Sequence, residues 1–271
     1  MASPPAPRIG IFDSGIGGLS VLRAVRQRLP GADLTYIADS RHTPWGDRPP
    51  GWVAARCTQL AGWLIDDGAD LVLVACNTGT TQAIAALRAR WPGRRFVGVE
   101  PGIKPAVAAS PGGRVVVMAT TGTLRSARLR QLVAAHAAGA AVLPLPCPGL
   151  ADAIEAATDN PATLAAQLDT LAETLHRLQA DTVVLGCTHY PLVADALRQR
   201  LGTRITLVDT ADAVARRVVS LLASVPTNGT AGALRLYSTA RPDGLQRAAQ
   251  HWLGSTAVVA MLQLPEPASS A

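Results

Sequence analysis

Residues 69–80 read Ala-Asp-Leu-Val-Leu-Val-Ala-Cys-Asn-Thr-Gly-Thr, and residues 180–191 read Ala-Asp-Thr-Val-Val-Leu-Gly-Cys-Thr-His-Tyr-Pro. In both stretches Ala-Asp opens an apolar run, and a small residue, a cysteine and two polar residues follow it. Such a run, with a helical pattern after it, is typical of a buried parallel strand that leads into a helix. Cys76 and Cys187 therefore fall at the carboxyl ends of two strands, the edge where open α/β sheets bind ligands.

A second pair of stretches repeats in the same order. Residues 8–14 and 114–120 each place an arginine before an apolar strand, and a glycine follows closely. The offset is 106 residues for this pair and 111 residues for the pair that carries the cysteines. The two repeats predict a duplicated α/β unit, and chance similarity in a chain rich in valine and alanine is the alternative.

Composition sets the class of protein. With 271 residues, of which 48% are hydrophobic and 16% charged, the chain can bury a large core. Its apolar runs are shorter than the roughly 18 residues that a membrane span needs, and its first residues lack the pattern of a signal peptide. The four cysteines form no CxxC pair, which favours free thiols in a reducing compartment. We expect a cytoplasmic protein with no membrane partner.

The net charge of +6 comes almost wholly from arginine, because Lys104 is the only lysine. The arginines are scattered over helix-like segments and few aromatic residues accompany them, which favours solvated helix faces over a nucleic-acid surface. Lys104 lies in Pro-Gly-Ile-Lys-Pro, which predicts a turn, and pyridoxal phosphate requires a lysine that forms a Schiff base. We therefore expect no cofactor of that kind.

A glycine-rich turn follows the first predicted strand, residues 9–12. Residues 13–18 read Asp-Ser-Gly-Ile-Gly-Gly and precede a helix. Glycines there let a ligand approach the backbone, and a helix N-terminus favours an anion. Because Asp13 would repel a phosphate, a carboxylate or a zwitterion is the ligand that fits best. A turn capped by Asp13 or Ser14, without a ligand, is the alternative.

Two thiols at matching strand ends suggest acid–base chemistry. A thiolate can remove a proton from carbon while a thiol on the opposite face returns one, provided that a helix N-terminus or a polar neighbour stabilises the thiolate. His189 could hold or donate a proton near Cys187, and Asp13 would lie beside Cys76 if their strands are neighbours. A Cys187–His189 nucleophile is an alternative, although residues two apart beyond a strand need not touch. A metal site lacks further ligands, and a purely structural role for each cysteine also stays open.

Other segments carry weaker expectations. Cys57 and Cys147 are expected to be structural, and Trp45 either walls a pocket or pins its loop. Residues 100–113 are expected to link the two units, and the helix after Cys76 is expected to begin at Thr80 or Thr81. The tail, residues 265–271, is expected to be loose.

Several of these motifs together resemble bacterial glutamate racemases. They are Asp-Ser-Gly-Ile-Gly-Gly at 13–18, Pro-Trp-Gly at 44–46, Ala-Cys-Asn-Thr at 75–78, Gly-Cys-Thr-His-Tyr-Pro at 186–191, and the segments 98–106 and 119–124. The resemblance implies interconversion of L- and D-glutamate without a cofactor or a metal, supplying D-glutamate for peptidoglycan. It also implies an α/β fold of two pseudo-symmetric domains with mainly parallel sheets and the active site in the cleft between them. The domains would be residues 1–99 with 208–271, and residues 100–207.

The same resemblance assigns roles to individual residues. Cys76 would be the base that acts on D-glutamate, with Asp13 beside it, and Cys187 the base for L-glutamate, with His189 as its helper. Glu155 would be an assisting carboxylate. The substrate-binding positions would be Asp13, Ser14, Trp45, Gly46, Asn77, Thr78, Thr188 and His189.

Two positions depart from the family pattern. Trp45 replaces a tyrosine, so a contact through the phenol hydroxyl is lost while backbone contacts could survive. Gly79 stands where a residue with a side chain is usual. These departures leave open a racemase for aspartate or another acidic amino acid. A non-catalytic, partner-binding protein is the alternative from another class, and the resemblance is compatible with a homodimer.

Overall fold

The computed structural model describes residues 6–157, 159–222 and 231–267. The chain divides into two compact units, a first unit of Met1–Val99 with Ala211–Ala271 and a second unit of Glu100–Thr210. The return to the first unit therefore falls at Ala211 rather than at the expected residue 208. The segment before Ala211 stays with the second unit because its strand β8 (Thr206–Val208) pairs with β7 (Thr182–Leu185).

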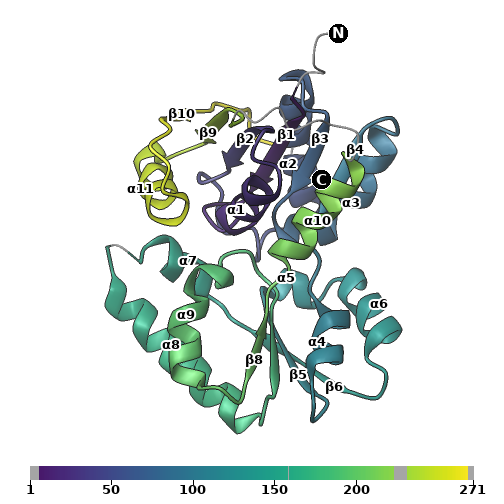
Figure 1. Cartoon of the computed structure of the whole chain (residues 1–271), viewed down its shortest axis with the longest axis vertical. Coiled ribbons are helices and arrows are strands. Elements are labelled where there is room, and N and C mark those ends of the chain that lie inside the picture. Colours follow the sequence, from purple (N-terminus) through teal and green to yellow (C-terminus); the bar gives the residue numbers. More distant parts are fainter. Residues whose placement is uncertain (1–5, 158, 223–230, 268–271) are drawn as a thin grey trace. The chain divides into compact units, whose positions relative to one another are not determined.

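Strands and helices alternate along almost the whole chain (Figure 1). The strands are β1 (Arg8–Asp13), β2 (Asp33–Ala38), β3 (Leu71–Val74), β4 (Arg95–Gly98), β5 (Arg114–Ala119), β6 (Ala141–Pro146), β7 (Thr182–Leu185), β8 (Thr206–Val208), β9 (Leu234–Ser238) and β10 (Val259–Met261). The helices are α1 (Leu19–Arg28), α2 (Pro50–Asp66), α3 (Asn77–Arg90), α4 (Ile103–Ala109), α5 (Thr121–Leu124), α6 (Ala127–His136), α7 (Leu150–Glu155), α8 (Pro161–Arg177), the 3-10 helix η1 (Tyr190–Val193), α9 (Ala194–Leu201), α10 (Ala211–Leu221) and α11 (Pro242–Leu253).

The two sheets contain the same arrangement of four strands. Within the described residues, the first unit has the strand order β10-β9-β2-β1-β3-β4 and the second has β6-β5-β7-β8. All of the pairs are parallel, and Ile9 lies opposite Leu71 just as Val115 lies opposite Thr182. The order β2-β1-β3-β4 is thus repeated as β6-β5-β7-β8 with an equivalent register. This match confirms the α/β fold with two related units that the repeated stretches predict.

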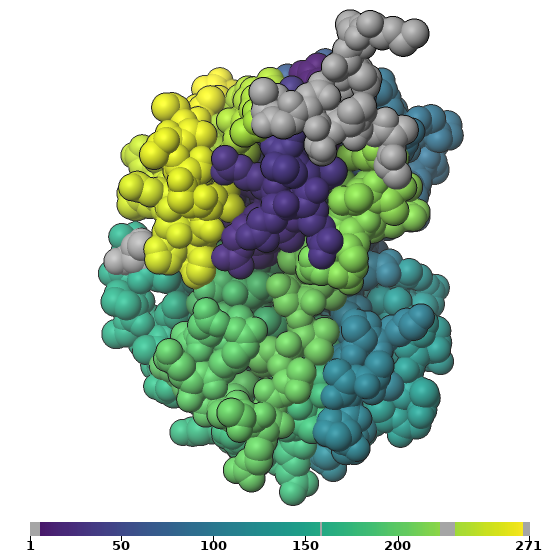
Figure 2. All heavy atoms as spheres, in the orientation of Figure 1, coloured from purple at the N-terminus to yellow at the C-terminus, as the bar shows by residue number. Residues whose placement is uncertain are grey.

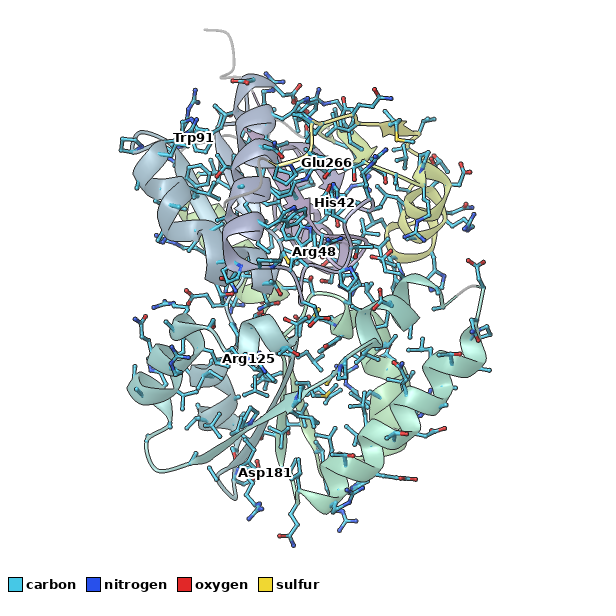
Figure 3. All side chains as sticks on the ribbon, turned by 180° about the vertical axis from the view of Figure 1, so that it is seen from behind. His42, Arg48, Trp91, Arg125, Asp181 and Glu266 are labelled. Atoms are coloured by element: carbon cyan, nitrogen blue, oxygen red, sulfur yellow. The ribbon has the colours of Figure 1, made fainter. Side chains whose placement is uncertain are left out.

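The repeated Ala-Asp pair has the same task in both sheets. The Asp70 carboxylate accepts a hydrogen bond from the Arg8 N–H at 2.8 Å, and the Asp181 carboxylate accepts one from the Arg114 N–H at 3.2 Å. Each aspartate therefore ties the start of its own strand to the start of the central strand. These ties lie at the amino ends of the strands, where Figure 3 labels Asp181, so the carboxyl ends carry the remaining polar residues of the motifs.

The last third of the chain completes the first unit. Strand β9 pairs with β2, and β10 pairs with β9, so the sheet is extended beyond its repeated core. Helices α10 and α11 both pack against α1. Figure 2 shows α1 in purple between α10 in light green and α11 in yellow. The residue pattern left open which unit this segment joins, and only the family resemblance assigned it to the first unit.

Two expectations about local structure are wrong, and a third is contradicted at one residue. Residues 100–113 contain helix α4, so Lys104 lies in the first turn of a helix rather than in a turn between prolines. Helix α3 begins at Asn77, not at Thr80 or Thr81. The tail is held at its start, because the Pro265 carbonyl accepts a hydrogen bond from Arg56 at 3.0 Å; residues 268–271 lie outside the described residues. None of the described helices combines the length and apolarity that crossing a membrane requires.

Candidate active site

The first cluster of polar side chains lies at the carboxyl ends of β1 and β3. We call Asp13, Ser14, Cys76, Asn77 and Thr78 the Cys76 cluster. Phe12 lies opposite Val74 in the parallel pair, and the Ala75 N–H donates to the Phe12 carbonyl at 2.8 Å. The strands β1, which ends at Asp13, and β3, which leads to Cys76, are therefore neighbours, as expected if the two side chains lie side by side. All five side chains are buried.

Cys76 is the N-cap of α3. Its backbone is extended, and its Sγ accepts a hydrogen bond from the Gly79 N–H at 3.4 Å. Ser14 Oγ lies 4.0 Å from the same sulfur. A helix N-terminus and an N–H donor both stabilise a thiolate relative to a thiol. The position of Cys76 therefore suits a group that gives up its proton to act as a base.

The glycine-rich turn brings the chain very close to Asp13. A Cβ on Gly18 would lie 2.8 Å from the Asp13 Cβ and 2.8 Å from the Tyr36 hydroxyl. That hydroxyl donates to the Gly15 carbonyl at 2.6 Å. Asp13 Oδ1 accepts the Ser14 N–H at 2.7 Å. The turn thus needs glycine at position 18 and holds Asp13 and Ser14 together.

The second cluster belongs to the second unit. We call Glu155, Cys187, Thr188 and His189 the Cys187 cluster. Cys187 and His189 follow β7, and Glu155 is the last residue of α7. Cys187 Sγ lies 3.7 Å from His189 Nδ1, and His189 Nε2 lies 2.8 Å from Glu155 Oε1. The cysteine and histidine therefore do touch, although they are only two residues apart, and the carboxylate holds the far side of the imidazole.

Electrostatics in the Cys187 cluster favour a protonated imidazole. Burial by itself would lower the pKa of His189, which is 1% exposed. The hydrogen bonds to Cys187 and Glu155, and the negative charges of both, outweigh burial and raise the pKa of His189 well above its ordinary value. A charged His189 can stabilise a thiolate at Cys187 or supply a proton to it.

The other two cysteines have the properties of structural residues. All four cysteines of the chain are free and buried. Burial raises the pKa of Cys147 to about 12, and its Sγ lies 3.4 Å from the Leu145 carbonyl oxygen. Burial also raises the pKa of Cys57 well above its ordinary value, and Asp39 and Asp13 act in the same direction. Both thiols are thereby kept protonated and unreactive.

Trp45 and Gly46 lie on the loop after β2. The Trp45 side chain is 1% exposed and belongs to the core of the first unit, where its Nε1 donates to Asp39 Oδ2 at 3.2 Å. The Arg48 N–H donates to the Trp45 carbonyl at 3.1 Å and closes a turn around Gly46. Of the two interpretations of Trp45, the structure supports the one in which it pins the loop. A substrate contact through the backbone of Trp45 and Gly46 stays a prediction.

Sequence reasoning missed a buried ion pair and a tyrosine. Arg56 and Asp39 are 1% and 0% exposed, and their side chains form a two-pronged ion pair. The signal was an arginine between Val53 and Leu60 on the apolar face of α2, which requires a partner. Tyr190 is buried beside Cys187 and Cys147, and burial raises its pKa well above its ordinary value. The only signal in the sequence for a role of Tyr190 was its position directly after His189.

The candidate residues thus gather in two sets, the Cys76 cluster with the loop of Trp45 and Gly46 in the first unit, and the Cys187 cluster in the second. Within the ranges that the structure describes, no three side chains of His, Cys, Asp or Glu come together as metal ligands would. The groups present are two thiols, an imidazole, two carboxylates and several hydroxyl and amide donors. Each cluster by itself combines a thiol with a carboxylate and other polar side chains, groups that can take up or release a proton.

Comparisons with known proteins agree with this chemistry. The family model described as Asp/Glu/Hydantoin racemase matches residues 19–218. A glutamate racemase from Pseudomonas paraeruginosa is 42% identical over 249 residues, which cover 91% of this chain and 94% of that protein. One from Ralstonia nicotianae is 42% identical over 263 residues, covering 96% of this chain and 94% of that protein.

Solved structures show the same likeness. The glutamate racemase isoform RacE1 from Bacillus anthracis superposes with a TM-score of 0.87 at 27% identity, covering 97% of this chain and 99% of that one. The Escherichia coli glutamate racemase, solved with L-glutamate and the activator UDP-MurNAc-ala, has a TM-score of 0.81 at 31% identity, covering 96% of this chain and all of that one. The chain therefore belongs to the Asp/Glu/Hydantoin racemase family, among the glutamate racemases.

Proposed function

We propose that this chain interconverts L- and D-glutamate by two-base proton transfer at the α-carbon. In the D-to-L direction the Cys76 thiolate takes the α-proton, so that a C–H bond breaks and an S–H bond forms. The Cys187 thiol then gives its proton to the opposite face of the carbanion and becomes a thiolate. The L-to-D direction reverses both steps, and the proton count balances without an oxidant or a cofactor.

One observation carries this proposal: the two thiols occupy equivalent strand ends in two units of the same topology, and each has its own polar support. Cys76 has the N-terminus of α3 and the Gly79 N–H. Cys187 has His189, which in turn has Glu155. A single nucleophile would need only one such arrangement. Two bases with separate support are what inversion at a carbon requires.

The remaining residues supply binding and orientation. We propose that Ser14, Asn77, Thr78 and Thr188 donate hydrogen bonds to the carboxylates of the substrate, aided by the N-terminus of α3, which favours an anion. Asp13 would orient the substrate beside Cys76 and hold its ammonium group. His189 and Glu155 would set the protonation of Cys187.

The cellular role follows from the family. We propose that the D-glutamate formed here is used for peptidoglycan in the cytoplasm. The related Escherichia coli enzyme was solved with UDP-MurNAc-ala, which the description of that structure calls its activator. The free state of all four cysteines fits a reducing compartment.

The proposal is tested by incubating the pure protein with D-glutamate in D₂O, with D-aspartate in parallel. Loss of optical rotation and deuterium at the α-carbon of both glutamate enantiomers are expected, with no pyridoxal phosphate added. Turnover of aspartate but not glutamate would correct the substrate to the shorter amino acid. Unchanged rotation with both amino acids would contradict the proposal.

A further inference from the structure

Trp45 is placed to act on Cys76 through the backbone. A Cβ built on Gly79 would lie 3.0 Å from Trp45 Cζ3, 3.2 Å from Val74 Cγ1 and 3.3 Å from Cys57 Sγ. The indole thus fills the space that a side chain at position 79 would occupy. The two departures from the family pattern, Trp45 and Gly79, are therefore a matched pair: the larger ring is accommodated because residue 79 has no side chain.

Gly79 is also the residue that hydrogen-bonds Cys76. Its N–H donates to Cys76 Sγ at 3.4 Å, in the first turn of α3. The indole lies on the side of Gly79 where a Cβ would be, beside the residue that supplies this donor. A displacement of the ring, or an added methyl group at residue 79, would move the donor relative to the sulfur.

The indole itself is held rigidly. Asp39 Oδ2 accepts from Trp45 Nε1 at 3.2 Å and from Arg56 Nε at 3.0 Å, and Asp39 Oδ1 accepts from Arg56 Nη2 at 2.6 Å and from Thr239 Oγ1 at 2.9 Å. Arg56 Nη1 donates to the carbonyl of Pro265. The Asp39 carboxylate thus accepts four hydrogen bonds from three side chains, so it is a firm anchor for the Trp45 ring.

The C-terminal segment also contacts the loop that carries Trp45. His42 Nε2 lies 3.7 Å from a Glu266 carboxylate oxygen, and the His42 and Trp52 rings meet edge to face with centroids 5.1 Å apart. Figure 3 shows Glu266, His42 and Arg48 following one another on this side of the first unit. The start of the loop that carries Trp45 thus contacts both α2, through Trp52, and the segment at Glu266.

We propose that Trp45 is a positioning residue for Cys76: the indole, anchored by the Asp39–Arg56 pair, presses on Gly79 and holds its N–H against the catalytic sulfur. The inference rests on the proposed function in one respect, that Cys76 acts as a thiolate. It differs from a substrate contact, because the Trp45 side chain acts from inside the core. It also explains why tryptophan and glycine occur together.

The test measures Cys76 directly. The pH dependence of Cys76 alkylation by iodoacetamide is followed by peptide mass spectrometry, with Cys187 in the same sample as reference. Trp45→Tyr and Gly79→Ala should each move the Cys76 midpoint upward by about half a pH unit, because a displaced N–H stabilises the thiolate less. Each should lower kcat by on the order of tenfold with a smaller change in KM. The double variant should recover to within about threefold of wild type, since the added methyl group fits the space that the indole leaves.

Trp63→Tyr is the matched control. Trp63 packs on the same core and meets the Tyr237 ring at 5.0 Å between centroids, away from Gly79. Its replacement should lower stability without moving the Cys76 midpoint. The charged and titratable groups that act on Cys57 beside Gly79, namely Asp13, Asp39 and Arg56, are unchanged in every variant. The same holds for His42 and the groups that act on it, Arg48 and Glu266.

Three results would overturn the inference. They are an unchanged Cys76 midpoint in Trp45→Tyr, an equal shift in Trp63→Tyr, or a defect in Gly79→Ala that Trp45→Tyr does not relieve. Gly79→Ala decides alone if Trp45→Tyr does not fold, because it keeps the indole. If the Cys76 midpoint shifts as expected but the protein does not racemise glutamate, the proposed function is refuted and the role of Trp45 stands. If the protein racemises glutamate but the midpoint does not shift, the role of Trp45 is refuted and the proposed function stands.

Discussion

His189 shows at the scale of one residue how the fold sets a protonation state. Its imidazole is fully enclosed, and that burial opposes a charge. The Glu155 carboxylate at 2.8 Å and the Cys187 sulfur at 3.7 Å reverse this effect and raise the pKa of His189 well above its ordinary value. The imidazolium therefore persists through neutral pH, where Cys187 needs a partner.

Glu155→Gln tests this arrangement. Glutamine keeps the hydrogen-bonding shape but removes the negative charge that raises the pKa of His189. His189 then loses its proton at lower pH, so the alkaline limb of the pH profile of kcat/KM should move to lower pH. The measurement is the rate of racemisation between pH 6 and pH 10, values chosen to span roughly the ordinary range of histidine and thiol titration.

Asp152→Asn is the control for that profile. Asp152 is exposed on the same helix, α7, and its replacement should leave the alkaline limb in place. An alkaline limb that stays unchanged in Glu155→Gln would show that Glu155 does not govern the protonation of His189.

At the scale of an element, the turn between β1 and α1 depends on close packing. A Cβ on Gly18 would lie 2.8 Å from both the Asp13 Cβ and the Tyr36 hydroxyl. Gly18→Ala should therefore lower the free energy of unfolding by about 1–3 kcal/mol, the usual cost of overpacking, and displace Asp13. Gly244→Ala in α11 is the control, since nothing lies within 4 Å of its added Cβ; it should stabilise by up to about 1 kcal/mol. Urea unfolding measures the free energy of unfolding of both variants. An equal change in the two would contradict the close packing of Gly18 against Asp13 and Tyr36.

The ion pair of Arg56 and Asp39 joins three elements. It connects α2 to the loop after β2 and, through Pro265, to the end of the chain. Arg56→Ala leaves a buried carboxylate without its counter-charge and should cost about 3–5 kcal/mol. Arg216→Ala breaks the exposed pair with Asp212 and should cost less than about 1 kcal/mol. A small loss in Arg56→Ala, measured by urea unfolding, would contradict the structural importance of the pair.

Several elements could be predicted because their apolar runs are compact and uninterrupted, as in β3, β5 and β7. Helix α4 could not, since Pro101, Pro105 and Pro111 suggest a linker. Pro105 is the third residue of α4, where the missing N–H would in any case lack an intrahelical partner. The start of α3 was misplaced because Asn-Thr-Gly-Thr has low helix propensity, and the cap that overrides it comes from the Cys76 sulfur.

For the whole molecule, the duplication was readable because both sheets use the same short motifs at the same strand positions. The Cys76 cluster followed from parallel strands that end at one edge. Pairs of side chains far apart in the sequence could not be predicted from the strand pattern. Asp39 and Arg56 are 17 residues apart, and Glu155 and His189 are 34 residues apart. The role of Glu155 was expected only from the family resemblance. For Arg56, the only signal in the sequence was a charged residue on the apolar face of a helix.

The two enantiomers of glutamate have equal free energies, so the ratio of kcat/KM in the two directions is fixed by equilibrium. The separate roles of the thiols must therefore be sought in proton exchange. The most direct measurement is α-proton exchange in D₂O with Cys187→Ala and Cys76→Ala, supplied with each enantiomer in turn. Cys187→Ala should exchange the α-proton of D-glutamate only, with retained configuration, and Cys76→Ala should do so for L-glutamate only. Racemisation at the wild-type rate by either variant, or exchange of both enantiomers by one thiol alone, would contradict the two-base account.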